Sequence, residues 1–212
     1  MENRNRLTYR VSAALAGEIL SQKLPVGAKL PSDTDLSEKY GVSRTVLREA
    51  LRVLGAKGLI TAKPRVGTLV AEAKHWALWD PQVLHWLTGA ALSEAARAPI
   101  LHHALDMRLA LEPALAALAS SRASDDAKQS LQHALRKLQE TPDLAHEQAF
   151  ISCLYDISGN QFAPFASHLA CWVIAQRQAP APMHHYQTLT AAIAQRASVE
   201  ARQCAMNYLI GD

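Results

Sequence analysis

The chain has 212 residues, of which 49% are hydrophobic and 19% charged, which fits one or two folded domains and excludes intrinsic disorder. The net charge is only +3, but residues 1–71 hold 12 Lys and Arg against 6 Asp and Glu, whereas residues 72–212 hold 10 against 13. A basic front (+6) and a mildly acidic back (−3) predict a polyanion-binding module joined to a second part.

The cysteines and the N-terminus give no sign of an extracellular or membrane protein. The three cysteines are widely spaced, which argues against structural zinc and a disulfide framework and favours buried, reduced thiols. The first ten residues are polar, and no stretch approaches the ~20 apolar residues of a membrane span. We therefore expect a cytoplasmic protein.

Three helices are predicted in the first sixty residues. Apolar residues at helical spacing indicate a helix over residues 8–24. Ser32, followed three positions later by Asp35, has the pattern of a capping box at the start of a second helix. Gly41 is placed to end that helix, and Ser43 to cap a third one. Two short helices around a tight turn predict a helix-turn-helix.

The third helix carries arginines on one face. Arg44, Arg48 and Arg52 recur at i, i+4 and i+8, a spacing that an ordinary solvated face also produces. Here they follow a helix-turn, and Ser43 and Thr45 stand at the end that would enter a DNA groove. Arginine pairs bidentately with guanine, and hydroxyls reach phosphates or bases. We therefore interpret this segment as a recognition helix.

A β-hairpin is predicted directly after the recognition helix. The runs 59–62 and 68–71 are β-prone and flank a turn that contains Lys63, Arg65 and Gly67. A hairpin in this place is a wing, whose basic tip would touch the DNA backbone or minor groove. A purely structural hairpin is the alternative.

The fixed positions of this first part resemble the winged helix of the GntR family. They include the runs L-P-S-D, G-V-S-R-T, R-E-A-L, G-L-I and G-T-L-V, which stand at residues 30–33, 41–45, 48–51, 58–60 and 67–70. The resemblance implies operator contacts at Arg44 and Arg48, with Ser43 and Thr45 beside them. The full set of predicted contacts adds Ser32, Thr34, Lys63, Arg65 and Gly67. The family often has arginine where Thr34 stands, so a contact there is weaker in this chain.

Residues 74–92 are predicted to be a linker with a short connecting helix that starts at Asp80-Pro81. Trp76, Trp79 and Trp86 would anchor it onto a neighbouring domain. The run W-A-L-W-D-P-Q-V-L-H-W resembles the linker of GntR regulators that respond to sugar acids such as galactonate.

The remaining chain predicts an all-helical bundle. Six helical segments and no strand are expected, at residues 94–122, 125–140, 144–158, 161–178, 184–196 and 199–209. Pro99 and Pro113 predict a kink or break in the first of them. The fold class is thus mostly α: a winged helix-turn-helix with a small hairpin over residues 1–73, the linker, and a bundle over residues 93–212.

The bundle resembles the FadR-type ligand-binding domain (FCD) of GntR regulators, through R-L-A-L-E at residues 108–112 and S-G-N at residues 158–160. Many such domains bind a divalent metal through an acidic residue and three histidines. Those positions fall here on Glu147, Ile151, Tyr186 and Tyr208. We therefore predict that the family's metal site is lost and that the chain has no metal cofactor.

The resemblance also implies an effector pocket lined by Arg108, Glu147, Tyr186 and Tyr208. A guanidinium holds a carboxylate bidentately, so Arg108 would bind an organic acid. The alternative for Arg108 is a salt bridge to Glu112 at i+4. The sequence leaves the two open.

Taken together, these patterns predict a transcriptional repressor that binds palindromic double-stranded operator DNA as a homodimer. A small organic acid such as a sugar acid would control it through the bundle. The alternative is a bundle that only dimerises, with its pocket filled by Ile151 and aromatic side chains. An enzyme is disfavoured, because the sequence has no nucleophile with a nearby base, no phosphate loop and no paired carboxylates at a useful spacing.

Overall fold

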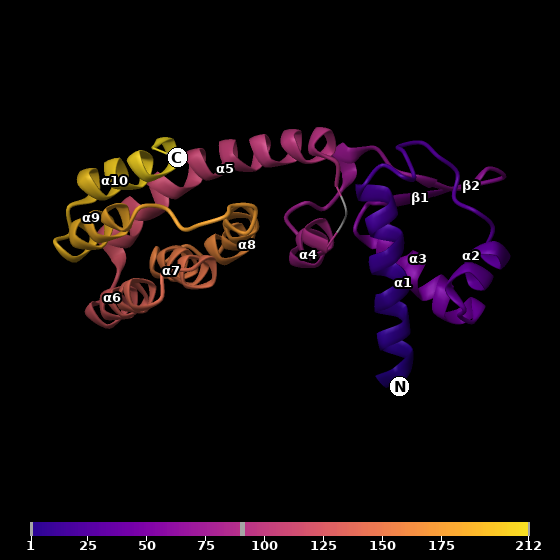
Figure 1. Ribbon diagram of the computed structural model, residues 1–212, viewed down its shortest axis with the longest axis horizontal. Coiled ribbons are helices and arrows are strands. Elements are labelled where there is room, and N and C mark those ends of the chain that lie inside the picture. The colour runs from indigo at the N-terminus through magenta and orange to yellow at the C-terminus, as the bar shows by residue number, and fades with distance from the viewer. Residues whose placement is uncertain (1, 90–91, 212) are drawn as a thin grey trace. The chain divides into compact units, whose positions relative to one another are not determined.

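The computed structural model describes residues 2–89 and 92–211, and it confirms the mostly α fold class (Figure 1). The chain divides into two compact units, Met1–Ala98 and Pro99–Asp212. Residues 90 and 91 of the predicted linker, and the two terminal residues, lie outside the described part. Within that part, no helix is long and apolar enough to cross a membrane.

The first unit, the head, contains a winged helix-turn-helix. Its elements are α1 (Glu2–Leu20), α2 (Asp33–Tyr40), α3 (Arg44–Ala56), β1 (Ile60–Lys63) and β2 (Gly67–Val70). The two strands pair antiparallel, with Ile60 opposite Val70 and Lys63 opposite Gly67. Helix α3 packs against α1, α2 and β1, so the head has one apolar core beneath its third helix.

The predicted helix caps of the head are confirmed. Asp35 donates its backbone N–H to Ser32 Oγ at 3.2 Å, and the Asp35 carboxylate accepts the backbone N–H of Ser32 at 3.2 Å. Ser43 Oγ accepts the N–H of Val46 at 3.4 Å. Gly41 has φ +62°, a left-handed conformation that glycine adopts without strain. These local bonds determine where α2 ends and where α3 begins.

The predicted bounds of three elements in the head were wrong. Helix α1 begins six residues earlier than residue 8 and ends at Leu20, because Gln22 takes φ +61° and leaves the helical conformation. Both strands lie one residue away from the predicted runs, so Lys63 and Gly67 belong to the strands. The tip is Pro64–Val66, closed by Val66 N–H donating to Lys63 O at 3.1 Å.

The segment after the hairpin packs onto the head. It forms a short 3₁₀ turn, η1 (Ala73–His75), and helix α4 (Pro81–Gly89), which packs against α1. Trp76 and Trp86 are buried as anchors, as predicted, whereas Trp79 is 42% exposed. An ion pair between Lys57, just after α3, and Asp80, just before α4, also holds this segment to the head. This part of the predicted linker therefore belongs to the first unit.

The bundle has the six predicted helices, and two of them have the predicted bounds. They are α5 (Glu94–Arg122), α6 (Asp125–Glu140), α7 (Leu144–Ile157), α8 (Ala163–Ile174), α9 (Met183–Ala194) and α10 (Ser198–Ile210). Of the kink or break predicted in α5, the break is absent: one helix runs through Pro99 and Pro113 without interruption. Each proline removes only one backbone donor, and the side chain of Pro113 is buried in the packed bundle.

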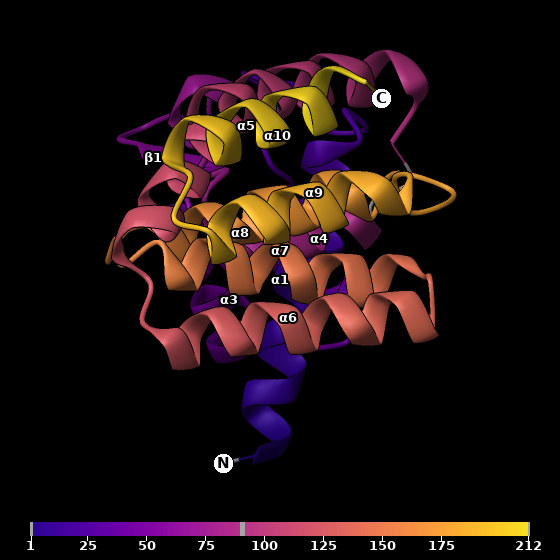
Figure 2. The same cartoon turned by 90° about the vertical axis from the view of Figure 1, so that its left-hand side faces the viewer.

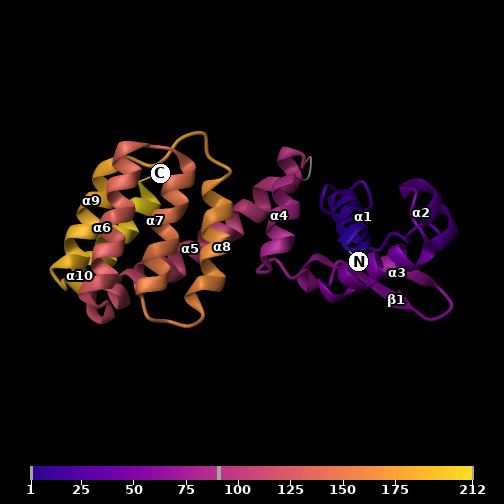
Figure 3. The same ribbon diagram turned by 90° about the horizontal axis from the view of Figure 1, so that it is seen from below.

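Aromatic side chains gather in the centre of the bundle. Helix α7 lies between α6 and α8, and α9 lies beside α6 and α10 (Figures 2 and 3). Phe150 meets Tyr186 edge to face at 5.2 Å between ring centroids, and Tyr186 lies 5.4 Å from Tyr208. Burying one such side chain stabilises a fold by about 1.5–3 kcal/mol. The three tyrosines of this core, however, also bring hydroxyl groups into it, and each hydroxyl needs a partner.

Candidate DNA-binding surface and buried polar cluster

Helix α3 presents a polar face to solvent. Its apolar side chains Val46, Leu47, Ala50 and Leu54 are buried in the head. Arg44, Thr45 and Arg48 are exposed, and 76% of the Arg48 side chain is accessible. Since the apolar face anchors the helix, the opposite face holds these basic and hydroxyl groups outward, as a major-groove reading helix requires.

The three arginines of this helix differ in their pairing. Arg52 donates from Nη2 and Nε to the carboxylate of Glu49, at 2.7 Å and 3.2 Å. Its hydrogen bond lowers the pKa of Glu49. Arg48 lies 3.8 Å from Asp33, and Arg44 has no ion-pair partner in the described chain. Arg44 and Arg48 are therefore more available for a new anionic partner than Arg52.

The wing tip has a strained, basic turn. Arg65 has φ +63°, and Pro64 precedes it, the residue order of a type II turn. Lys63 and Arg65 are both exposed. Gly67 has φ +114°, and a Cβ there would lie 3.0 Å from the Lys29 side chain. Glycine at this position thus allows a third basic residue, Lys29, to lie against the wing.

The structure brings two predicted contacts from separate elements, Ser32 and Gly67, to one cleft of the head. A cleft of about 320 Å³ is lined by Ser32 and Asp33 at the start of α2 and by Gly67, Thr68 and Lys29 around the wing. All nine predicted contact residues are exposed: Ser32, Thr34, Ser43, Arg44, Thr45, Arg48, Lys63, Arg65 and Gly67. Their contacts with DNA stay a prediction.

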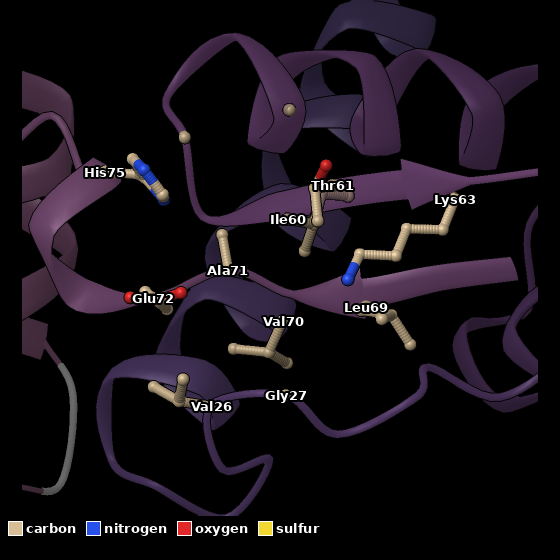
Figure 4. A pocket seen from close by; sticks show the side chains of 12 residues that line it. Val26, Gly27, Ile60, Thr61, Lys63, Leu69, Val70, Ala71, Glu72 and His75 are labelled. Carbon is tan, nitrogen blue, oxygen red and sulfur yellow. The ribbon is translucent and has the colours of Figure 1, made fainter. Parts of the chain in front are cut away.

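A larger hollow of about 580 Å³ lies along the hairpin (Figure 4). Most of the residues that line it are aliphatic or glycine, and its three titratable residues are Lys63, Glu72 and His75. Figure 4 shows Glu72 and His75 at the end of the hairpin away from Lys63. These side chains do not converge on one point, so the hollow lacks the arrangement of a catalytic site.

Arg108 and Glu112 form a buried ion pair on α5. Arg108 donates from Nε to Glu112 Oε2 at 2.9 Å and from Nη2 to Oε1 at 3.1 Å. The two side chains are 4% and 0% exposed. Tyr155 Oη on α7 also donates to Glu112 Oε2, at 3.1 Å. The salt bridge to Glu112, one of the two alternatives for Arg108 in the sequence, is therefore present. The hydrogen bond from Tyr155 connects it to α7.

Glu147 on α7 is the second buried carboxylate, and its Oε1 atom accepts three hydrogen bonds. The donors are Arg177 Nη1 at 2.8 Å, Tyr186 Oη at 2.5 Å and Tyr208 Oη at 3.0 Å. Arg108 Nη2 in turn donates to Tyr208 Oη at 3.0 Å. Tyr208 thus joins the two carboxylates into one network, which we call the buried polar cluster.

The buried polar cluster balances its own charge. It contains two guanidinium groups and two carboxylates, so its formal charge is zero. Burial opposes the charge of Arg108, but neighbouring Glu112 outweighs this effect, and the pKa of Arg108 rises well above its usual value. Burial also raises the pKa values of Tyr155, Tyr186 and Tyr208, which keeps all three phenols protonated as donors.

The four predicted effector residues, Arg108, Glu147, Tyr186 and Tyr208, lie together in this cluster. Binding of an effector there stays a prediction. Sequence reasoning missed Tyr155 and Arg177. Tyr155 stands two helical turns after Glu147, so helical spacing could have found it. Arg177 follows the end of α8 in a connection, where no periodic pattern points inward.

The residues at the family's metal positions do not fit a transition metal. Ile151 supplies only hydrocarbon and is completely buried. The hydroxyls of Tyr186 and Tyr208 are already donors to Glu147. Within the described residues, no three His, Cys, Asp or Glu side chains are grouped so that they could hold an ion. A site for zinc or a similar metal needs about four N, S or O ligands, whereas these positions offer one carboxylate and two phenols that burial keeps protonated.

Two of the three cysteines, Cys153 and Cys171, have raised thiol pKa values. All three are free and half-buried, rather than fully buried as expected. Burial raises the pKa of the Cys153 thiol to about 11, and it also raises the pKa of Cys171. At neutral pH these two groups are thiols, not thiolates.

Each of the two parts of the chain matches a known protein family. Residues 7–70 match the bacterial regulatory proteins of the gntR family, and residues 103–210 match the FCD domain. The chain belongs to the GntR family. It is a DNA-binding transcriptional regulator with a winged-helix head and an FCD domain.

Curated relatives are regulators as well. The uncharacterized HTH-type transcriptional regulator YieP of Escherichia coli K12 is 31% identical over 76% of this chain and 72% of its own length. The galactonate operon transcriptional repressor of the same organism is 26% identical, over 95% of this chain and 93% of its own. Among solved structures, Lar of Listeria monocytogenes has a TM-score of 0.62 at 16% identity, and the match covers 96% of this chain and 93% of that protein's chain. At this identity the similarity supports the fold alone.

The raised pKa values of the cluster tyrosines predict an incomplete alkaline titration. Tyr155, Tyr186 and Tyr208 should stay un-ionised through pH ~10, where a free phenol titrates, because their neutral forms are favoured in the folded state. Their stabilising hydrogen bonds are present below pH ~10 and are lost at higher pH. Absorbance at 295 nm should therefore reach the value expected for five ionised tyrosines only when the protein unfolds. Full ionisation in the folded state near pH 10 would contradict this structure.

Proposed function

We propose that this regulator is a repressor of the FadR subfamily that binds a palindromic operator as a two-fold homodimer. In this proposal α3 enters the major groove of each half-site, where Arg44 and Arg48 bind guanine edges or phosphates and Ser43 and Thr45 contact the backbone. Ser32 and Thr34 at the start of α2, and Lys63, Arg65 and Gly67 in the wing, complete the contact surface. The supporting observation is that α3 holds two basic side chains outward with no strong internal partner.

We further propose that a small hydroxylated organic acid, such as a sugar acid, controls operator binding through the buried polar cluster. The observation that carries this proposal is Glu147 Oε2, which is fully buried and has no hydrogen-bond partner in the described chain. A ligand hydroxyl is the donor that this atom needs. A ligand carboxylate would compete with Glu112 or Glu147 for Arg108 or Arg177. Galactonate and Uxu appear in the names of two regulators similar to this chain.

Effector binding at this place would alter helix packing directly. The cluster joins α5, α7, α9, α10 and the connection after α8. A ligand that replaces one of its hydrogen bonds favours a different arrangement of these helices. That differential affinity is what a ligand needs to shift a regulator between two states.

The second candidate is a bundle that serves only for dimerisation. Two observations favour it: Ile151 is completely buried, and the two ion pairs of the cluster already balance each other. In that case the chain would still bind its operator, but no small molecule would change the affinity.

Operator binding can be tested with single substitutions in α3. Arg44→Ala and Arg48→Ala should each weaken binding roughly tenfold or more, because each loses an arginine contact worth about 1–3 kcal/mol. Electrophoretic mobility shift with DNA from the upstream region of the chain's own gene measures the change. Arg52→Ala is the matched control, and we expect a smaller effect because Arg52 is paired with Glu49. Unchanged affinity in both Arg44→Ala and Arg48→Ala would show that the contact assignment is wrong.

Effector binding can be tested with three six-carbon probes. D-galactonate carries a carboxylate and hydroxyls, hexanoate only the carboxylate, and galactitol only hydroxyls. We expect galactonate or a related sugar acid to raise the unfolding midpoint by roughly 5–10 °C at about a hundred times its Kd, and the other two to have little effect. Differential scanning fluorimetry measures the shift. No stabilisation by any sugar acid, short-chain carboxylate or fatty acyl compound would support the dimerisation-only alternative.

A further inference from the structure

Arg177 reaches the centre of the bundle from outside its helices. It follows the end of α8, in the connection that leads to α9, and its side chain is 23% exposed. Its Nη1 atom nevertheless lies 2.8 Å from Glu147 Oε1. The guanidinium therefore bridges the rim of the bundle and a completely buried carboxylate.

Glu147 needs a positive charge close by. Its side chain has no exposed surface, and an ionised carboxylate in such a place is costly unless it is paired. Arg108, the other guanidinium of the cluster, donates two hydrogen bonds to Glu112 and one to Tyr208, and it reaches Glu147 only through Tyr208. Arg177 is thus the cation in direct contact with Glu147.

Arg177 lies against Glu147 where a metal ion would otherwise bind this carboxylate. Glu147 Oε1 already accepts three donors, and two of them are the phenols at the family's histidine positions. A divalent cation bound at Oε1 would have to displace these donors, and one bound at either carboxylate oxygen would lie next to a guanidinium of like charge. Ile151, one helical turn after Glu147, offers it no ligand atom.

We propose that Arg177 is a built-in counter-cation for Glu147, which takes the place of a metal ion in this bundle. The bundle then folds and stays folded without a divalent metal. This inference does not depend on the identity of an effector, because it concerns the pairing of Glu147 alone. Its test is accordingly independent of operator binding and of effector binding.

The first test measures metal content and metal dependence of the intact chain, purified without a histidine tag. We expect inductively coupled plasma mass spectrometry to find less than about 0.1 metal ion per chain. The midpoint of thermal unfolding should change by no more than about 1 °C with EDTA or with added Zn²⁺, Ni²⁺ or Mn²⁺. Stoichiometric bound metal, or a large drop in the midpoint with EDTA, would overturn the proposal.

The second test removes the counter-cation. Arg177→Met should lower the unfolding midpoint by about 10 °C, because Glu147 is left buried and unpaired. Arg177→Lys should retain much of the stability, since it keeps the charge. The double variant Glu147→Gln/Arg177→Met should unfold at a higher temperature than Arg177→Met alone, because a neutral amide needs no counter-cation.

Arg202→Met is the matched control, since Arg202 is an exposed arginine on α10 of the same bundle and should have little effect. If Arg177→Met does not fold, the double variant and Arg177→Lys still decide the question. Recovery of a folded protein in either supports the proposal. Equal midpoints for the wild-type chain and Arg177→Met, or no recovery in both of the other variants, would contradict it.

Discussion

The bundle depends on the pairing of two carboxylates that have no access to water. Glu112 and Glu147 are both completely buried, and an unpaired charge in such a position costs several kcal/mol. Arg108 neutralises the first and Arg177 the second, while the Tyr208 hydroxyl connects the two pairs. Because these groups come from different helices, the helices cannot shift independently. The apolar core then packs around a polar centre whose geometry is largely determined by hydrogen bonds.

The two units place their charged side chains differently. In the head, α3 buries only apolar side chains and keeps Arg44 and Arg48 outside, where a polyanion can reach them. In the bundle, charged side chains lie inside and cancel one another. The charge pattern that the sequence shows, a basic front and a mildly acidic back, is consistent with this division. A DNA-reading surface has to stay unpaired, whereas a buried cluster has to be paired.

The head could be predicted from the sequence because its signals are local. The caps at Ser32 and Ser43 and the left-handed Gly41 lie within a few residues of the bonds they make, so their outcome follows from short-range chemistry. The bundle helices were also visible in their periodicity, but the uninterrupted path of α5 through Pro113 depends on tertiary packing. Of the cluster, the sequence identified Arg108, Glu147, Tyr186 and Tyr208 through a family resemblance. Arg177 lies outside a helix, and only the folded connection shows that it points inward.

The most direct test of this account is a double-mutant cycle on Arg108 and Glu112, measured by chemical denaturation. Arg108→Met should reduce the free energy of unfolding by about 3–5 kcal/mol, because Glu112 is left buried without its counter-charge. Glu112→Gln added to that variant should recover part of the loss, so the two substitutions should couple by about 1–3 kcal/mol. Additive effects, or a loss below about 1 kcal/mol for Arg108→Met, would contradict the conclusion that the bundle depends on this buried pairing.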